Sequence, residues 1–404
     1  MKNYKFILVS LLLSAIAVNA QTLEDYLAIA KENSSEIKIS NYEYEIAKEK
    51  VLEVGNNTNT SFNFGYYIQS PETRVGPQVA MGGIRQQLPW FGTKNAEREA
   101  AKSSADIWQY DIELSERELF YKVKEVYFNL YEKHSITIIL EENKQILKTY
   151  EKMALAALEN NKASFSDVSL IRVQKNEIDN KIFKNNNEII ALSKNFNRLL
   201  QQDVNKEVII NRDVVLSEFL IENKSIDNHP SLHKMDQLNE ALDYENEQIG
   251  KENTPVIELG LDYIIVSEIE DVDVVDNGKD IILPTISLSI PIFNKDYKSK
   301  HNQIKIQKDL IVSEKINQKR LLEMALEDAI LNFKNSVIEI EMAQKNKVEV
   351  QRAIRIDFKA YETGLLDYDN IVELQLQKIM YQLTEIEATK GALIAKASME
   401  YLIN

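Results

Sequence analysis

The chain has 404 residues and contains no cysteine. This absence excludes disulfide bonds, thiolate metal ligands and lipid attachment to an N-terminal cysteine. Basic residues are also outnumbered, because 63 Asp and Glu face 48 Lys and Arg, and the net charge is −15. Nucleic acids select basic surfaces, so this acidity argues against a nucleic-acid partner. It is compatible with a cationic cargo or with simple solubility.

Proline and glycine are rare, with 7 and 11 copies, and they are unevenly placed. All prolines lie within residues 71–89 and 230–291, and neither residue type occurs between Thr93 and His229. Both types interrupt helices, so the stretches without them predict long helices, each about 100 Å at roughly 1.5 Å per residue. The predicted long helices are 93–159 and 296–362, followed by return helices at 166–201 and 368–402.

Long apolar runs are absent after the first 20 residues. Lys2 and Lys5 precede the apolar run Phe6–Val18, and Ala20 ends a segment of the kind that signal peptidase cleaves. We therefore interpret residues 1–20 as a secretory signal peptide. The alternative, an uncleaved anchor, is disfavoured because the run is shorter than the ~20 residues that span a bilayer.

The windows that hold the prolines and glycines predict strands. Ser61–Tyr66 alternates polar or small residues with aromatic ones, and Ile286–Ile290 alternates with period two. We predict two strands near 60–88 and two near 256–290, each long enough to cross an outer membrane when tilted. One helix, at 23–54, is predicted before the first pair, and another, at 232–248, before the second.

One short motif occurs twice, each time between a predicted strand and a predicted long helix. Leu88-Pro89-Trp90-Phe91-Gly92 is matched by Ile290-Pro291-Ile292-Phe293-Asn294. The chain is therefore predicted to contain two copies of one unit, residues 21–210 and 229–404, joined by a connector at 211–228. Such long helices leave faces uncovered within one chain, which favours assembly of several copies.

These features together resemble the TolC-like outer-membrane efflux proteins across essentially the whole mature sequence. The resemblance rests on the duplicated order of elements and on the two strand-to-helix motifs. It rests also on Phe196-Asn197-Arg198-Leu199-Leu200 and on Tyr361-Glu362-Thr363-Gly364-Leu365, which is followed by Ile371-Val372-Glu373-Leu374-Gln375. Each motif alone is weak, but their order and spacing are specific.

The resemblance implies a mainly α fold with membrane β-structure. Three copies would form a 12-stranded outer-membrane β-barrel, with four strands from each chain, and a periplasmic α-barrel of long antiparallel helical hairpins. It also implies docking to a periplasmic adaptor and an inner-membrane pump such as an RND transporter, in the envelope of a Gram-negative bacterium. Such proteins are conduits, so neither an enzymatic activity nor a cofactor is expected.

The turn after the second long helix is the expected periplasmic tip and gate. By resemblance, this set comprises Tyr361, Gly364, Leu365, Asp367, Asp369, Asn370 and Glu373. In a trimer each carboxylate becomes a ring of three, which raises the local cation concentration in a narrow pore. The hypothesis is an acidic constriction at Glu373, helped by Asp369 or Asp367, and the alternative is an ordinary solvated helix face.

Two further groups of residues are candidates for contacts in the assembly. The first-repeat tip comprises Lys162, Ala163, Ser164 and Asp167, and capping of the return helix is an equally good interpretation. The strand–helix junctions comprise Pro89, Trp90, Phe91, Gly92, Pro291 and Phe293. His229 and His233 have the spacing of a helical metal pair, but no third ligand is evident, so no metal site is predicted.

The expected function is a trimeric conduit that carries substrates across the periplasm and outer membrane. The strand-to-helix motif and the acidic composition resemble the heavy-metal-cation branch of this family, which implies such cations as cargo, with drugs or other small molecules as alternatives. Another alternative is the outer-membrane component of type I protein secretion. A different class altogether is a coiled-coil envelope scaffold without a pore.

Overall fold

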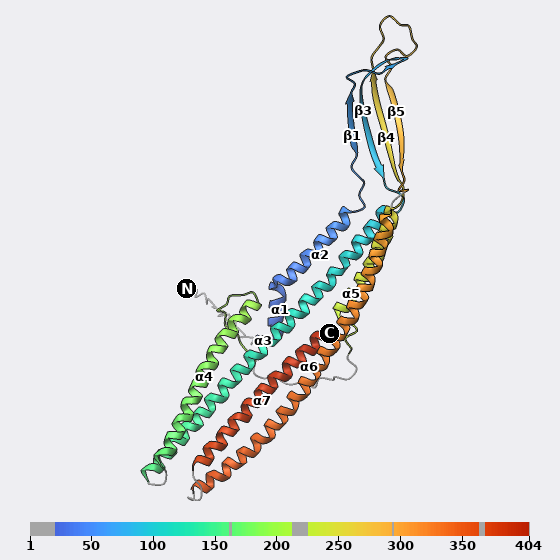
Figure 1. The fold of residues 1–404 in the computed structure, drawn as a ribbon. Helices are drawn as coiled ribbons and strands as arrows, with labels where there is room; N and C mark the ends of the chain where they lie inside the picture. The colour runs from blue at the N-terminus through green and yellow to red at the C-terminus, as the bar shows by residue number, and fades with distance from the viewer. Residues whose placement is uncertain (1–20, 161–163, 212–224, 293–294, 363–367, 404) are drawn as a thin grey trace, which may run out of the picture. The chain divides into compact units, whose positions relative to one another are not determined.

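The computed structural model describes residues 21–160, 164–211, 225–292, 295–362 and 368–403. It contains seven helices and five strands in these residues, in an order that repeats helix, strands, long helix and return helix (Figure 1). The elements are α1 (Leu23–Asn33), α2 (Ser35–Glu53), β1 (Ser61–Tyr66), β2 (Glu72–Thr73), β3 (Gly76–Leu88), α3 (Thr93–Glu159), α4 (Phe165–Leu199), α5 (Pro230–Glu252), β4 (Val256–Val266), β5 (Ile281–Ser289), α6 (Asp296–Glu362) and α7 (Tyr368–Ile403).

The two long helices have the predicted bounds. Helices α3 and α6 each contain 67 residues, and neither contains a proline or glycine. The return helices α4 and α7 also lie where the sequence places them. Local sequence was sufficient here because a helix needs only continuous favourable residues and apolar positions at 3–4 spacing.

The predicted single helix at 23–54 is wrong, because the chain breaks at Ser34. The backbone of Ser34 is extended, with φ −50° and ψ 121°, and its side chain is fully buried. Its N–H bonds to the carbonyl of Ala30, which ends α1, and α2 begins at the next residue. The break aims Tyr26 and Ala30 of α1 into the core, where both are buried.

The chain divides into two compact units. Unit 1 comprises residues 1–34, 119–221 and 328–399, and unit 2 comprises 35–118, 222–327 and 400–404. Each unit draws on both of the halves that the sequence predicts as copies, and α3 and α6 contribute residues to both units. Contacts therefore group the chain differently from the predicted order of copies along the sequence.

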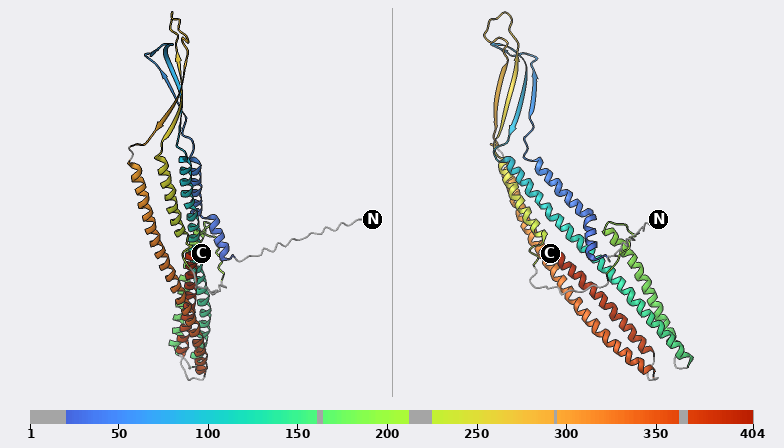
Figure 2. Two further views of the ribbon diagram at one scale, coloured as in Figure 1. Left: turned by 90° about the vertical axis from the view of Figure 1, so that its right-hand side faces the viewer. Right: turned by 180° about the vertical axis from the view of Figure 1, so that it is seen from behind.

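Unit 1 is held together by apolar packing and by ion pairs between antiparallel helices. Its main cluster includes Leu147, Ile171 and Ile371, which come from α3, α4 and α7 and have no exposed surface. At the edge of the α3–α4 pair, the Lys144 ammonium lies 2.5 Å from the Asp179 carboxylate. Figures 1 and 2 show α3 beside α4 and α6 beside α7 in this unit.

A second cluster of unit 1 organises the end of α4. Phe196 is fully buried and packs edge-on against the Tyr26 ring, with centroids 5.0 Å apart. The buried Asn197 amide donates to the carbonyl of Lys206 at 2.7 Å and to that of Val204 at 3.1 Å. The motif that begins at Phe196 therefore turns the chain and fixes the segment that follows α4.

The β-branched segment Val208-Ile209-Ile210 forms no strand, and the backbone of Ile209 bonds to a tyrosine side chain instead. The Tyr26 hydroxyl donates to the Ile209 carbonyl at 3.2 Å and accepts from the Ile209 N–H at 2.9 Å. The Tyr127 hydroxyl accepts from the Asn211 N–H at 3.0 Å. Backbone N–H and C=O groups need hydrogen-bond partners, and these two tyrosine hydroxyls supply them in place of a neighbouring strand.

Unit 2 contains one antiparallel sheet with the order β1-β3-β4-β5, and the short β2 pairs with β3 (Figures 1 and 2). The pairs Asn63↔Gly83, Gly83↔Asp262 and Asp262↔Leu283 place one row of residues across all four long strands. Within the described residues, β1 and β5 each have one neighbour, so each leaves one edge unpaired.

The helices of unit 2 are joined by a series of ion pairs between α6 and α5 or the residues just before it. Lys300 pairs with Glu252 at 3.3 Å, Lys308 with Asp243 at 2.5 Å, and Lys319 with Asp227 at 2.8 Å; Lys315 also pairs with Asp236. None of the described helices has a stretch that is long and apolar enough to span a bilayer.

Candidate functional site

Tyr361 brings the two predicted tips within electrostatic reach of each other in unit 1. It lies near the end of α6 and packs, half-buried, against the main apolar cluster. Burial first, and the charge of Asp167 second, raise the pKa of the Tyr361 phenol. Asp167 belongs to the first turn of α4, so the charge of a first-tip residue acts on a second-tip residue. Gly364, Leu365 and Asp367 lie outside the described residues.

The first turns of α7 separate buried from exposed residues. Ile371 and Val372 are buried, whereas Asp369, Asn370 and Glu373 are exposed to solvent. The helix therefore uses one face for packing against the core of unit 1 and presents its carboxylates on another. This arrangement leaves the Glu373 carboxylate available to water or to another molecule.

A buried amide pair lies behind this face, and sequence reasoning missed it. The Gln375 side chain, 2% exposed, donates from Nε2 to Asn143 Oδ1 at 2.5 Å. Asn143 Nδ2 donates in turn to Gln382 Oε1 at 3.1 Å. The sequence signal for this pair was Asn143, a polar residue between the apolar positions Leu140 and Leu147 of α3. Such satisfied amides fix the register of α7 against α3.

The first tip is built around a helix cap. The Ser164 hydroxyl accepts from the Asp167 N–H at 3.3 Å, and the Asp167 carboxylate accepts from the Ser164 N–H at 2.8 Å. This reciprocal pair is a capping box, which satisfies N–H groups that the first turn of α4 leaves free. The capping interpretation therefore accounts for both residues. Lys162 and Ala163 lie outside the described residues.

Replacing Ser164 by alanine is expected to lower the free energy of unfolding by about 1 kcal/mol, since it removes this cap. Denaturant unfolding followed by circular dichroism measures the loss. Ser169→Ala is the control, because Ser169 lies inside α4 and its hydroxyl bonds to the Phe165 carbonyl rather than to a free N–H. Equal losses in the two variants would contradict the capping role.

A carboxylate between two cations joins α3 and α4 near this tip. Glu151 accepts from Lys175 Nζ at 2.5 Å and from Arg172 Nε at 2.7 Å. These hydrogen bonds, led by that of Lys175, hold the pKa of the Glu151 carboxyl below its usual value. These two ion pairs join α3 to α4 near the first-repeat tip.

The first strand–helix junction depends on Gly92. Its φ of +86° lies in the left-handed region, which glycine adopts without strain. The Thr93 N–H then bonds to the Trp90 carbonyl at 3.2 Å, and the Ala96 N–H to the Gly92 carbonyl at 3.0 Å, which starts α3. The Phe91 ring is 84% exposed, so it packs on little of its own chain.

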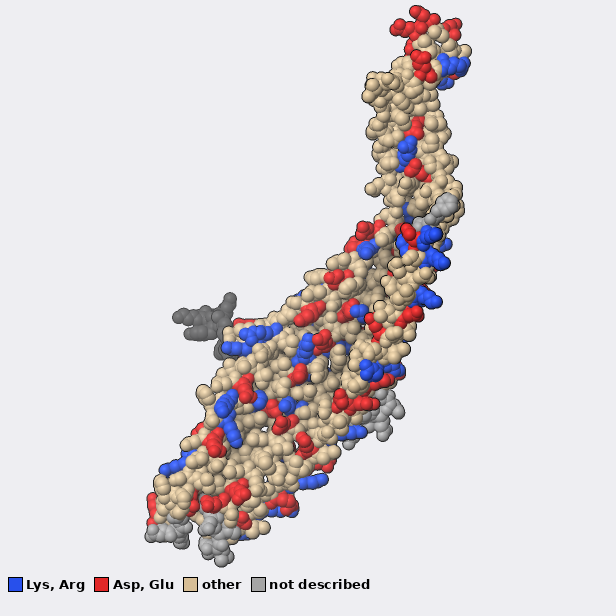
Figure 3. All heavy atoms as spheres, viewed as in Figure 1, with Lys and Arg blue, Asp and Glu red and all other residues tan. Residues whose placement is uncertain are grey.

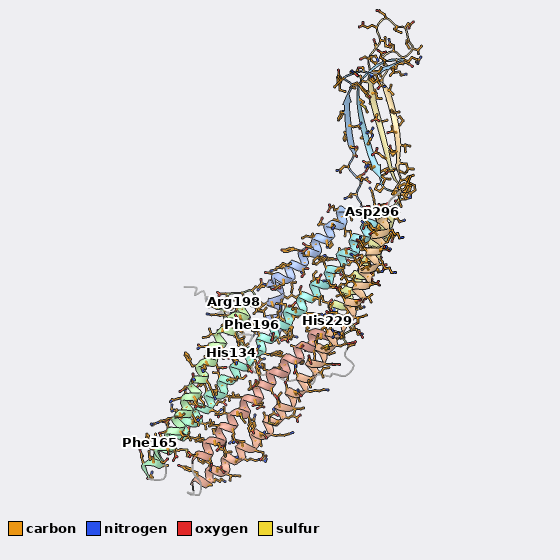
Figure 4. All side chains as sticks on the ribbon, viewed as in Figure 1. His134, Phe165, Phe196, Arg198, His229 and Asp296 are labelled. Atoms are coloured by element: carbon orange, nitrogen blue, oxygen red, sulfur yellow. The ribbon has the colours of Figure 1, made fainter. Side chains whose placement is uncertain are left out.

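The second junction differs from the first. Pro291 follows the last residues of β5, and α6 begins at Asp296, whose carboxylate lies in the first helical turn (Figure 4). Phe293 lies outside the described residues. Negative charge in a first turn stabilises the helix N-terminus, so Asp296 favours the start of α6.

His229, one of the two histidines considered as metal ligands, caps the N-terminus of a helix. Its Nδ1 accepts from the Ser231 N–H at 3.2 Å and so caps α5, which begins at Pro230. The ring is 1% exposed and lies edge-on against Tyr401. Among the described residues, no group of three or more His, Asp or Glu side chains is placed to hold a metal ion.

The chain matches no protein-family model and no curated protein sequence. Solved structures do match it. VceC of Vibrio cholerae, an outer membrane protein, superposes with a TM-score of 0.73 at 12% identity, over 94% of this chain and 95% of VceC. CusC, described by its transmembrane channel formation, gives 0.75 at 14% identity, over 95% of this chain and 92% of CusC.

The CmeC outer membrane channel of Campylobacter jejuni gives a TM-score of 0.69 at 14% identity, over 94% of this chain and 85% of CmeC. The agreement covers both the strands and the long helices, since almost the whole chain is included. The chain therefore has the fold of the TolC-like outer-membrane efflux channels.

Proposed function

We propose that this protein is the outer-membrane channel of a tripartite efflux system and works as a homotrimer. The observation that carries the proposal is the sheet of unit 2. Its two edge strands, β1 and β5, each lack a second neighbour among the described residues. Unpaired edges recruit other strands, and β5 of one copy pairing with β1 of the next would close 12 strands into a barrel.

The side chains of the sheet support a membrane setting. One face carries the exposed apolar residues that a lipid environment favours, and it bears no charged residue among the four long strands. These residues are Phe62, Phe64, Tyr66, Ile84, Leu259, Leu261, Tyr263, Ile265, Ile282, Ile286 and Leu288. Lipid-facing strands alternate in this way, with apolar residues outward and polar residues toward the lumen.

The helices would form the periplasmic part of the conduit. Exposed apolar residues remain on the outer faces of α2 and α6, for example Ile46 at 63% and Ile316 at 67% exposure. Packing between copies would bury them, as the three-fold assembly requires. The tips near Asp167 and Tyr361 would meet a periplasmic adaptor, and an inner-membrane pump would supply the cargo. The protein would need no catalytic group or cofactor.

Recordings from purified trimers in planar bilayers test the channel directly. Discrete, long-lived conductance steps are expected. A protein that remains soluble without detergent, sediments as an elongated particle and gives no steps would overturn the proposal in favour of a coiled-coil scaffold.

At the tip, we expect Glu373 to act as a ring of three carboxylates. Glu373→Gln should lower the preference of the channel for cations and weaken block by divalent ions, since a narrow acidic ring concentrates cations. Glu387→Gln is the control, because Glu387 is also exposed on α7, about 21 Å further along at ~1.5 Å per residue. Equal selectivity in wild type and Glu373→Gln would assign the residue to a solvated helix face.

The acidic composition and the Glu373 ring favour cations as cargo, with heavy-metal cations as the first candidate. Drugs or other small molecules are the alternative. Growth of a deletion strain on toxic metal salts and on organic antimicrobials, with and without the restored gene, distinguishes the two. Protection against metals alone would support the first candidate.

A further inference from the structure

The charged residues of the four long strands all lie on one face of the sheet. The register pairs Gln87 with Glu258, Arg85 with Gly260, and Gly83 with Asp262, so these residues share a face. Arg85, Glu258 and Asp262 are the charged residues of β1, β3, β4 and β5. The opposite face is the apolar one described above. If the sheet lines a barrel, every strand charge faces the lumen.

Two of these charges neutralise each other. Arg85 Nη2 lies 3.3 Å from Asp262 Oδ2 and 3.4 Å from Oδ1, and the Asp262 side chain is 5% exposed. A carboxylate this buried needs a partner, and the guanidinium supplies one. Arg85 itself remains 36% exposed, so the pair sits at the surface of the lumen face.

Two glycines make room for this pair. A Cβ at Gly83 would collide with the Asp262 carboxylate and with Asn63, and a Cβ at Gly260 would collide with Thr285 and press on Arg85. Gly83 and Gly260 lie beside the charges in the adjacent strands. Glycine at these two positions therefore leaves the space that the Asp262, Asn63 and Thr285 side chains occupy beside the ion pair.

No basic side chain among the described residues forms an ion pair with Glu258. Its Oε2 accepts from Gln87 Nε2 at 3.3 Å, which is a hydrogen bond to a neutral amide. Among the described strand residues, the one basic side chain on this face is Arg85, and Asp262 occupies it. The strand region of one chain thus carries one uncompensated negative charge on its polar face. Figure 3 shows the strands largely free of charge apart from a small mixed group.

We infer that Glu258 is a cation-selecting residue of the strand lumen, and that Arg85 limits this selectivity by neutralising Asp262. The inference rests on the proposed trimeric channel, in which three copies would place three Glu258 carboxylates at one level. The cargo class that such a ring favours is cationic. Salt screens the charges of the ring, so the effect of the ring on ion selectivity is strongest at low salt.

Reversal potentials across a bilayer with a tenfold KCl gradient test the inference, at low total salt. We expect Glu258→Gln to lower the potassium-to-chloride permeability ratio about twofold, because a charge ring sets ion preference. Arg85→Gln should raise the ratio, since it frees Asp262. The double variant Arg85→Gln/Asp262→Asn is the matched control and should keep the wild-type ratio.

A wild-type ratio in both Glu258→Gln and Arg85→Gln would overturn the inference while leaving the channel intact. Absence of any conductance in the wild type would overturn the proposed function and this inference together. Arg85→Gln can destabilise the sheet by leaving Asp262 unpaired. Glu258→Gln leaves no buried charge unpaired, because glutamine keeps a hydrogen bond to Gln87. If Arg85→Gln fails to fold, the permeability ratio of Glu258→Gln alone therefore tests the inference.

Discussion

Replacing Phe196 by alanine is expected to lower the free energy of unfolding by about 3–5 kcal/mol, because it removes a buried aromatic ring and leaves a cavity. The ring has no exposed surface and contacts Tyr26 and Tyr127, at centroid distances of 5.0 and 6.3 Å. Figure 4 shows Phe196 near the end of α4. The loss extends beyond the ring, since Tyr26 and Tyr127 also hold the backbone of Ile209 and Asn211.

Denaturant unfolding in detergent, followed by far-ultraviolet circular dichroism, measures this loss. Amide hydrogen exchange at Ile209 and Asn211 provides a local readout, because both N–H groups bond to tyrosine hydroxyls beside the ring. Phe183→Ala is the matched control: it removes the same side chain from the same helix, where the ring is 68% exposed. A loss below about 1 kcal/mol for Phe196→Ala, or an equal loss in both variants, would contradict the assignment of Phe196 to the core.

The second large effect is a loss of stability in acid that depends on His229. Burial, and then the positive charge of Arg117, lower the pKa of His229 from 6.5 to about 4, and Glu113 opposes the shift. The helix cap adds a reason, because Nδ1 must stay unprotonated to accept from the Ser231 N–H. Figure 4 shows His229 at the start of α5.

The direction follows from linkage between protonation and folding. Above pH 6.5 the imidazole is neutral in both states. Between pH 6.5 and about 4 the unfolded chain binds a proton that the folded chain does not, so stability falls as the pH falls. The loss from this residue amounts to at most about 3 kcal/mol and is complete near the folded pKa.

Unfolding midpoints at pH 7 and pH 4.5 measure the effect in the wild type and in His229→Asn. Asparagine also caps helices well but does not titrate, so the variant should lose less stability on acidification. His233→Asn, one helical turn further along α5, is the control and should keep the wild-type dependence. An unchanged pH dependence in His229→Asn would show that other groups cause the acid sensitivity.

Several predictions made from the sequence depended on local properties, and these agree with the structure. The bounds of α3 and α6 follow from the absence of proline and glycine, since helix formation is decided within a few residues of each position. The helix predicted at 232–248 spans Pro230–Glu252, and its start is explained by the suitability of proline for a first helical turn. The break at Ser34 could not be read in this way, because it serves the packing of Tyr26 against the distant Ile209.

For the candidate site, the sequence proposed tip residues but not how they relate. It proposed Tyr361 and Asp167 separately, and the charge of Asp167 raises the pKa of the Tyr361 phenol. The sequence allowed two interpretations of Ser164, an assembly contact or a helix cap, and the hydrogen bonds show the cap. It missed the buried pair of Asn143 and Gln375, which lie 232 residues apart, because an isolated polar residue in a helix looks like an exposed one until its neighbour is known.

The sequence by itself determined the two long helices and the alternating apolar residues of the strands, since those properties follow from residue type and periodicity. Tertiary structure alone decided which residues meet. The register of β3 against β4 brings Arg85 to Asp262, 177 residues away. A shift of one residue would send each side chain to the other face. Pairing over such distances depends on the whole sheet, so no local pattern encodes it.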